Sequence, residues 1–162
     1  FVAATNANDT VPRFLQNGVY DPKPSIATIS NAMDVGNPSN FVRIQEMYQN
    51  DLKQFEKDFS SYTFSDAATL EAMKTIQEQK GYIAEPHGAV GYLGLKKELQ
   101  NHPDALGIFL ETAHPIKFLD IVEPALGVTL PIPSQIESVL NKEKRSTKIK
   151  TYEELKAFLQ NQ

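Results

Sequence analysis

Two short segments carry the residues whose types and spacing could do chemistry. One reads Ala-Glu-Pro-His-Gly-Ala-Val-Gly over residues 84–91, and the other reads Leu-Glu-Thr-Ala-His-Pro-Ile-Lys-Phe over residues 110–118. In each, an apolar run gives way to polar residues and then to a proline, which is common in the first turn of a helix. Ligands of open α/β proteins bind where strands end, because the following helix N-termini present free N–H groups. Both segments are therefore predicted to be ligand-competent junctions.

The first junction is followed by small residues that leave one helix face nearly bare. Gly88, Gly91 and Gly94 recur along this face. A bare face allows close approach by a strand or by a flat ligand, and the sequence leaves both readings open. The ordinary reading is helix-on-sheet packing. Glu85 is expected to be an exposed carboxylate unless a cofactor lies beside it.

The second junction offers a hydroxyl at the end of an apolar run. Thr112 comes just after Gly107–Leu110, and its hydroxyl can donate one hydrogen bond and accept others. It could meet a ligand or cap the next helix. His87 and His114 raise the possibility of a metal, but their surroundings lack the carboxylate–histidine spacing of zinc hydrolases. We therefore expect no metal site.

Composition excludes several classes of function. The 162 residues carry a net charge of −4 with a pI near 5.4, which argues against nucleic acid as a partner. No apolar run approaches the roughly 20 residues that span a bilayer, so no membrane association is expected. Cysteine is absent, which excludes disulfides and fits a cytoplasmic location. No Ser-His-Asp order, phosphate-binding loop or dinucleotide glycine fingerprint occurs.

Apolar periodicity gives a coarse order of elements. Strands alternate with helices, which predicts the α/β class with a mainly parallel sheet. A long segment at 20–40, rich in Pro, Ser, Asn and Gly, is expected to be irregular. Strands are predicted at 1–5, 82–84 and 107–110, and helices at 10–17, 41–59, 66–80, 86–100, 115–122 and 152–159.

The chain begins abruptly on its first apolar run. Phe1 is not preceded by methionine, and the run lacks the features of a signal peptide. We expect that an upstream segment has been removed. At the other end, the sequence from Leu130 is first Pro-rich, then basic, and then helical.

Five stretches of the sequence resemble threonine synthase of the bacterial and fungal type. They occur in the family's order across residues 1–130, and the combination is specific. They are Ala-Ala-Thr-Asn-Ala-Asn-Asp-Thr-Val-Pro-Arg-Phe at 3–14, Ser-Asn-Ala-Met-Asp-Val at 30–35, Pro-Ser-Asn-Phe-Val-Arg at 38–43, Glu-Pro-His-Gly-Ala-Val at 85–90 and Thr-Ala-His-Pro-Ile-Lys-Phe at 112–118.

The resemblance implies a partial fold-type II pyridoxal-phosphate (PLP) enzyme with a tryptophan synthase β-like large domain. Residues 1–130 would form the C-terminal part of the PLP-binding domain, and residues 131–162 an extension with a basic segment and a terminal helix. The family converts O-phospho-L-homoserine and water to L-threonine and phosphate. Its PLP-binding lysine and glycine-rich phosphate loop have no match here. The chain alone is therefore expected to be inactive and to need the N-terminal half.

The resemblance also implies roles for particular side chains. Thr112 would face the pyridine nitrogen of PLP, and Glu85 with the helix after it would lie along the ring. Asn6, Asp34 and Lys117 would lie on the substrate side. Ile116 departs from the smaller residue that the family often carries, which puts little in doubt.

Two other functions remain open at this stage. One is a non-catalytic interaction or regulatory module that retains the enzyme fold. The other is a different fold-type II enzyme, such as a threonine dehydratase or a cysteine synthase, and the loop Asn31-Ala32-Met33-Asp34 argues against it. Strands that lack their neighbours would expose apolar surface, so the chain alone is also expected to self-associate.

Overall fold

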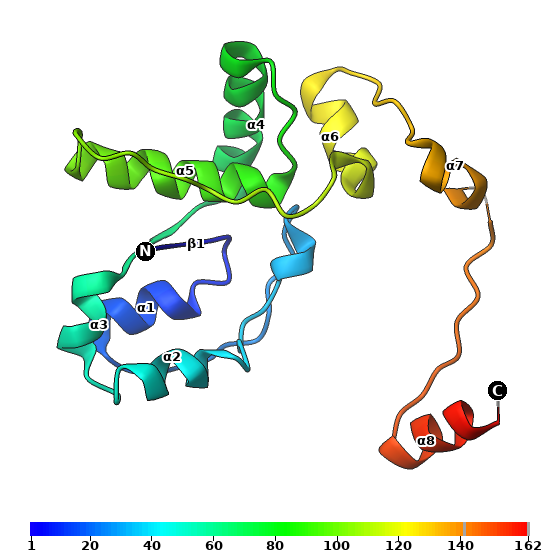
Figure 1. Ribbon diagram of the computed structural model, residues 1–162, viewed down its shortest axis with the longest axis horizontal. Coiled ribbons are helices and arrows are strands. Elements are labelled where there is room, and N and C mark those ends of the chain that lie inside the picture. Colours follow the sequence, from blue (N-terminus) through cyan, green and yellow to red (C-terminus); the bar gives the residue numbers. More distant parts are fainter. Residues whose placement is uncertain (141, 162) are drawn as a thin grey trace. The chain divides into compact units, whose positions relative to one another are not determined.

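The computed structural model describes residues 1–140 and 142–161. The chain divides into two compact units, Phe1–Leu130 and Pro131–Gln162, and most of the secondary structure lies in the first (Figure 1). The elements of the first unit are β1 (Val2–Thr5), α1 (Thr10–Asn17), η1 (Asn31–Met33), α2 (Phe41–Met47), α3 (Leu52–Asp58), β2 (Ser60–Thr63), α4 (Asp66–Lys80), α5 (Pro86–Asn101), η2 (Pro115–Phe118) and α6 (Leu119–Leu126).

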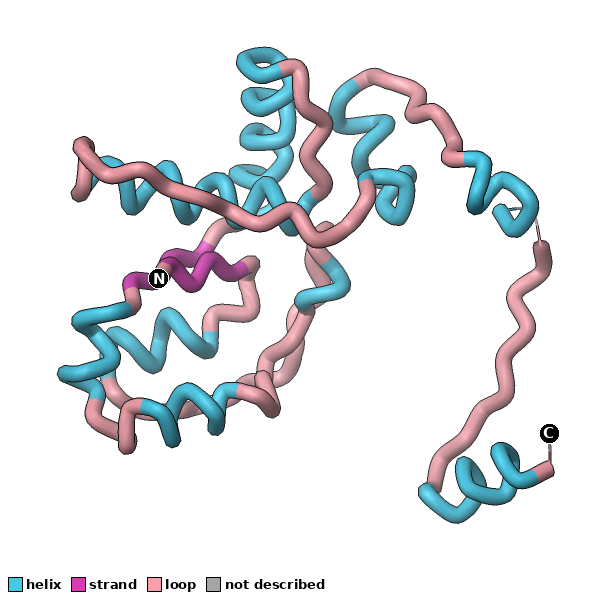
Figure 2. Tube along the Cα trace, viewed as in Figure 1, coloured by secondary structure: helices cyan, strands magenta, loops and turns pink. Residues whose placement is uncertain are grey.

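The sheet of the described chain joins two strands that are far apart in the sequence. β1 and β2 run parallel, with Val2 opposite Ser60 and Thr5 opposite Thr63, and they lie side by side in Figure 2. The α/β class and the parallel direction are as predicted. The sequence did not predict β2, because Ser-Ser-Tyr-Thr contains no apolar run.

Helix α5 packs closely on β1. A Cβ atom placed on Gly94 would lie 2.6 Å from the Cβ atom of Ala4, which leaves no room for a larger residue. The next glycine along this helix, Gly91, faces the side chain of Phe109 at 3.7 Å from its Cβ position. Packing against protein therefore explains the bare helix face at these two positions.

Several helix ends follow the local signals in the sequence. Ser65 caps α4 by accepting a hydrogen bond from the backbone of Ala68, and α4 ends at Gly81 with a positive φ of 63°. Helix α1 ends in the same way at Gly18. Asp9 precedes α1 but makes no capping bond, and its carboxylate pairs instead with Arg13 at 2.8 Å.

The single helix predicted at 41–59 is wrong. The chain forms two helices, α2 and α3, that are separated at Gln49 and Asn50, where φ is 50° and 57°. Such left-handed residues break the helical hydrogen-bond ladder. Asp51 then caps α3 by accepting from the backbone N–H of Lys53 at 2.9 Å.

The strands predicted at 82–84 and 107–110 are also wrong, because both segments are irregular. Residues 107–110 have no neighbouring strand in the described part of the chain, and strand geometry needs such a partner for its backbone hydrogen bonds. Their apolar side chains remain exposed, Ile108 by 89%. Residues 82–84 instead link α4 to α5 and place Ala84 in a buried position.

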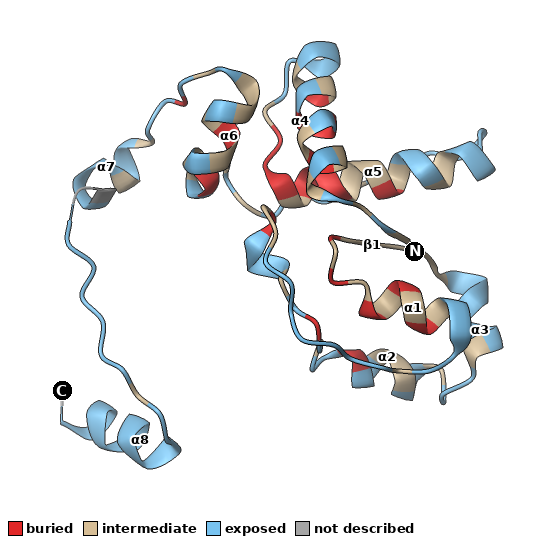
Figure 3. Ribbon diagram, turned by 180° about the vertical axis from the view of Figure 1, so that it is seen from behind, coloured by how far each residue is buried: buried red, intermediate tan, exposed pale blue. Residues whose placement is uncertain are grey.

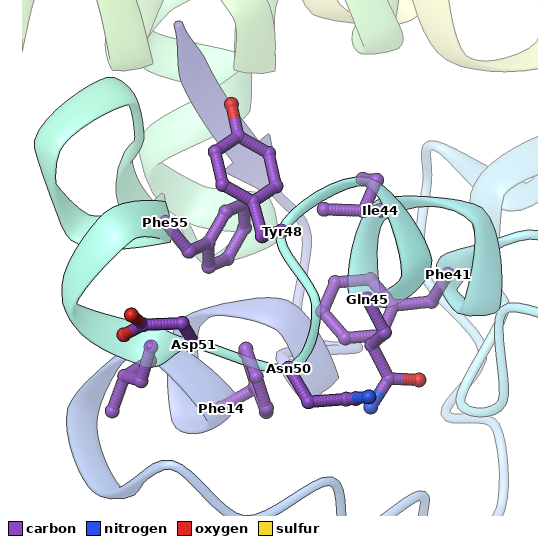
Figure 4. A pocket seen from close by; sticks show the side chains of 9 residues that line it. Phe14, Phe41, Ile44, Gln45, Tyr48, Asn50, Asp51 and Phe55 are labelled. Atoms are coloured by element: carbon purple, nitrogen blue, oxygen red, sulfur yellow. The ribbon is translucent and has the colours of Figure 1, made fainter.

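Two hydrophobic cores hold the first unit together (Figure 3). In the first, α4, α5 and α6 bring together Met73, Ala89 and Val122, all fully buried. The second is aromatic, and the rings of Phe14 and Phe41 meet edge to face with centroids 5.0 Å apart (Figure 4). The cavity beside these rings measures only about 10 Å³, so this region is a packed core.

The second unit contains α7 (Ser134–Leu140) and α8 (Tyr152–Gln160). The terminal helix predicted from the sequence is present, and it begins with a capping box formed by Thr151 and Glu154. Across both units, none of the helices that the structure describes is long and apolar enough to cross a membrane.

Candidate functional site

The first junction forms a buried polar cluster at the start of α5. Glu85 is fully buried, so the expectation of an exposed carboxylate is wrong. Its carboxylate caps the helix by accepting hydrogen bonds from the backbone N–H of His87 at 3.0 Å and of Gly88 at 2.9 Å. The same carboxylate contacts Nδ1 of the His87 ring. The Glu-Pro-His-Gly sequence therefore builds a self-contained helix cap around a buried charge.

The hydrogen bonds of Glu85 determine its charge. Burial raises its pKa, but hydrogen bonds from the His87 side chain and from the backbone of His87 and Gly88 lower it more, so the pKa lies below its ordinary value. Glu85 is therefore an anion at neutral pH. Its three donors occupy most of the acceptor capacity of a carboxylate.

The two junctions are in contact in the structure, and Glu111 of the second junction makes this contact. The Glu111 carboxyl group lies over Gly88, and neither of its buried oxygen atoms has a hydrogen-bond partner in the described chain. Burial and the charge of Glu85 raise the pKa of Glu111 to about 7, while His87 opposes the shift. Glu111 was not among the residues predicted from the sequence, although its position beside Thr112 at the end of the same apolar run was an available signal.

Thr112 is exposed and does not cap the next helix. His114 caps η2 instead, because its Nδ1 atom accepts from the backbone N–H of Ile116 at 3.1 Å. The cap interpretation of Thr112 is therefore wrong. Within the described residues its hydroxyl makes no hydrogen bond, so it is available to a ligand. Lys117 lies two residues into η2, where its side chain is also exposed.

Asn6 and Asp34 are brought together by the long irregular segment. Asn6, only 5% exposed, donates from Nδ2 to an Asp34 carboxylate oxygen at 3.0 Å. Thr28 completes the link, because its backbone N–H and its hydroxyl both donate to Asp34, at 2.9 and 2.7 Å. These bonds attach the segment to the end of β1 and fix the orientation of the Asn6 amide.

A cavity of about 180 Å³ joins the Asn6 network to the first junction. Asn6 and His87 both line it, so the structure places one residue of each region around the same space. Thr112 and Lys117 are not part of its lining. The remaining lining residues are Ala4, Thr5, Val11, Ser30, Met33, Val35, Pro38 and Val90.

The titratable side chains do not assemble into a cation site. Across residues 1–140 and 142–161, no group of three or more His, Cys, Asp or Glu side chains is arranged to hold a metal ion.

The family model and the related proteins that match this chain all point to one family. Residues 88–159 match the family model described as threonine synthase, C-terminal. The threonine synthase of Haemophilus influenzae is 47% identical over 137 residues, which are 85% of this chain and 31% of that protein. The threonine synthase of Saccharomyces cerevisiae is 34% identical over 164 residues, covering 76% of this chain and 32% of that protein.

Solved structures agree with the sequence matches. The crystal structure of threonine synthase from Escherichia coli superposes with a TM-score of 0.86 at 38% identity, covering 99% of this chain and 37% of that one. PLP-bound threonine synthase from Brucella melitensis gives a TM-score of 0.75 at 26% identity, covering 88% of this chain and 36% of that one. The chain thus spans about a third of the length of its relatives. It belongs to the threonine synthase family and corresponds to the C-terminal region of these enzymes.

Proposed function

We propose that the full-length protein containing this chain is a threonine synthase that converts O-phospho-L-homoserine and water to L-threonine and phosphate with PLP. The observation that carries the proposal is the superposition of 99% of the chain on the Escherichia coli enzyme with a TM-score of 0.86. The Brucella melitensis relative is described as PLP-bound, which supports the same cofactor. The absence of cysteine fits a cytoplasmic reaction, and this location stays a prediction.

The residues of the second junction fit PLP as one wall of its site. When bound, PLP supplies an electron sink for carbanion chemistry. Among residues 1–140 and 142–161, Thr112 offers an exposed hydroxyl without a hydrogen-bond partner, next to the similarly unpartnered carboxyl group of Glu111. We assign Thr112 to hydrogen bonding with the pyridine nitrogen, because a neutral hydroxyl can serve this atom without forcing its protonation.

We assign Glu85 a supporting position on the cofactor side. Its carboxylate is already engaged with the start of α5 and with the His87 ring. It therefore acts by holding these groups in place beside the ring of PLP. The alternative is a purely structural role, in which Glu85 only caps helix α5.

We assign the substrate side to Asn6, Asp34 and Lys117. Asn6 lines the 180 Å³ cavity, and Asp34 holds the Asn6 amide in a fixed orientation. The exposed ammonium group of Lys117 supplies a positive charge that suits a phosphate group. The structure does not bring Lys117 to the cavity, so its role depends on the rest of the enzyme.

We propose that the 162-residue chain is inactive alone, because no part of it resembles the family's PLP-binding lysine segment. The rival is a module that retains the fold without catalysis. The test is phosphate release from O-phospho-L-homoserine, measured with PLP for the full-length protein and for the 162-residue chain. Release by the full-length protein alone is expected. Release by neither would favour the non-catalytic module, and release by the short chain would contradict its inactivity.

A further inference from the structure

The first α5 turn contains a carboxylate–histidine pair. Because Glu85 is a buried anion that contacts Nδ1 of His87, it favours the ring form that carries its proton on Nδ1. In a neutral imidazole the other nitrogen, Nε2, then has an unshared electron pair. This is the form in which a histidine can accept a proton.

The rest of the His87 ring is held in place by packing, but its second nitrogen lacks a hydrogen bond within the described chain. Its ring packs against that of Phe118, with centroids 4.8 Å apart. Its Nε2 atom is buried and has no hydrogen-bond partner in the described chain. Buried polar atoms in native proteins are nearly always paired, so an orphaned nitrogen indicates a missing water or ligand.

The cavity beside this ring singles out His87 among its polar lining residues. Thr5 bonds to β2, and Asn6 and Ser30 bond to each other and to Thr28. In the described part of the chain, His87 alone among these polar lining side chains retains an atom without a partner. The volume of about 180 Å³ exceeds the space that one water molecule needs.

We propose that His87 is a catalytic residue that accepts a proton at Nε2 from the reacting water, and that Glu85 is its positioning residue. The proposal rests on the proposed threonine synthase function. Across that reaction, water provides the hydroxyl group of threonine and loses one proton. The bond between Cγ and the phosphate oxygen breaks with its electron pair, and the phosphate takes up one proton. The new carbon–oxygen bond forms at Cβ, which gives up one hydrogen while Cγ gains one. Nε2 holds the proton of water as the new carbon–oxygen bond forms, and the proton is then passed on to balance the one that phosphate takes up.

Two titratable groups, Glu85 and Glu111, act on His87, and a third, Tyr82, is affected by both of them. Glu85 lies on the same turn, and Glu111 approaches over Gly88 from the segment after α5. Tyr82 lies on the preceding segment, where burial and the charges of Glu111 and Glu85 raise its pKa. Variants of His87 should therefore be compared with a variant of Glu85 under identical conditions.

The test uses the full-length protein and two substitutions. His87→Asn keeps an amide donor for Glu85 but has no atom at the Nε2 position, and His87→Gln reaches that region but cannot take a proton. Both should retain bound PLP, measured by its visible absorbance, with KM for O-phospho-L-homoserine changed only a few-fold. We expect kcat to fall by about 10²- to 10⁴-fold, the usual contribution of a general base. His102→Asn is the control, since His102 is exposed and its ring pairs with Glu98 of α5.

The positioning role of Glu85 has its own readout. Glu85→Gln retains an acceptor for the helix cap but removes the charge that favours a protonated ring. The preference for a proton on Nδ1 should then be lost, and kcat should fall while bound PLP is retained. In addition, ¹⁵N NMR of the histidine rings, assigned by difference from His87→Asn, should show the Nδ1–H form in the wild type at neutral pH.

The outcomes separate the two proposals. Wild-type protein without phosphate release would overturn the proposed function and the role of His87 together. An active wild type with equally active His87→Asn would overturn the role of His87 alone, as would an Nε2–H ring at neutral pH. Loss of PLP or of thermal stability together with activity would mean a structural role and would also overturn it.

Discussion

The carboxyl group of Glu111 occupies the space that a side chain on Gly88 would fill. A Cβ atom at Gly88 would come within 1.9 Å of a Glu111 carboxylate oxygen. The two residues belong to segments that the sequence presents as separate junctions, one at each end of α5 and its following loop. Their contact is what unites the buried polar cluster, and it can be tested from both sides.

Glu111 should make the stability of the chain depend on pH. Its pKa is raised from 4.5 to about 7, so the folded state binds this proton more tightly than the unfolded state. Its contribution is fully present below pH 4.5 and is lost as pH rises through 7. The shift corresponds to an upper limit of about 3 kcal/mol. Thermal melts of the 162-residue chain from pH 4.5 to 8 should show this loss.

The matched variant for this prediction is Glu111→Gln, which keeps the shape and cannot ionise. It should be more stable than the wild type at pH 8 and should lose most of the advantage near pH 4.5. Comparing the two proteins cancels the opposite contribution of Glu85, whose lowered pKa favours folding at higher pH. Parallel melting curves for the two proteins at all pH values would contradict the burial of Glu111.

Alanine at Gly88 and at Gly94 should have different consequences. At Gly88 the obstructing group is the end of a flexible side chain, so Gly88→Ala should displace Glu111 into solvent at a cost of under about 1 kcal/mol. At Gly94 the obstruction is the Cβ atom of Ala4 on β1, which cannot swing away. Gly94→Ala should therefore cost about 1–3 kcal/mol. Urea unfolding at neutral pH measures both, and equal costs would contradict the two contacts.

Local signals predicted the helices far better than the sheet. Ser65, Gly81 and Pro86 mark helix ends through bonds within a few residues, so these ends could be found from the sequence. The contact of Glu111 with Gly88 depends on tertiary packing and could not. The segment 107–110 has the composition of a strand, but composition cannot supply the neighbour that a strand needs.

The candidate site shows the same division. Thr112 and Glu85 were singled out by their places at the two junctions, and the cofactor roles that the resemblance implies for them stay predictions. The burial of Glu85 was not foreseen, because a carboxylate becomes stable in a buried position only with donors such as His87 and Gly88 in place. Nothing in the sequence of the irregular segment 20–40 indicated that its residues would form the hydrogen bonds of the buried Asn6 amide.

Removing the Thr112 hydroxyl should weaken cofactor binding in the full-length enzyme. Thr112→Val keeps the shape but leaves the pyridine nitrogen without its partner, at a cost of about 1–3 kcal/mol. This corresponds to roughly a 5- to 150-fold loss shared between PLP affinity and turnover. Thr112→Ser retains the hydroxyl and is the control. A valine enzyme with wild-type PLP affinity and turnover would end the assignment.

The 162-residue chain should self-associate through the segment 105–110. Leu106 and Ile108 are 101% and 89% exposed, and the segment borders a groove of about 520 Å³ together with β1 and α5. An apolar segment with unpaired backbone groups invites strand pairing with another chain. Light scattering should show dimers or larger species whose fraction rises with protein concentration.

Ile108→Lys should reduce association, because a lysine on an edge opposes pairing. Val42→Lys is the matched control, since Val42 is 61% exposed on α2, away from the groove. A monomeric wild type at all concentrations, or equal effects of the two lysines, would contradict association through this segment.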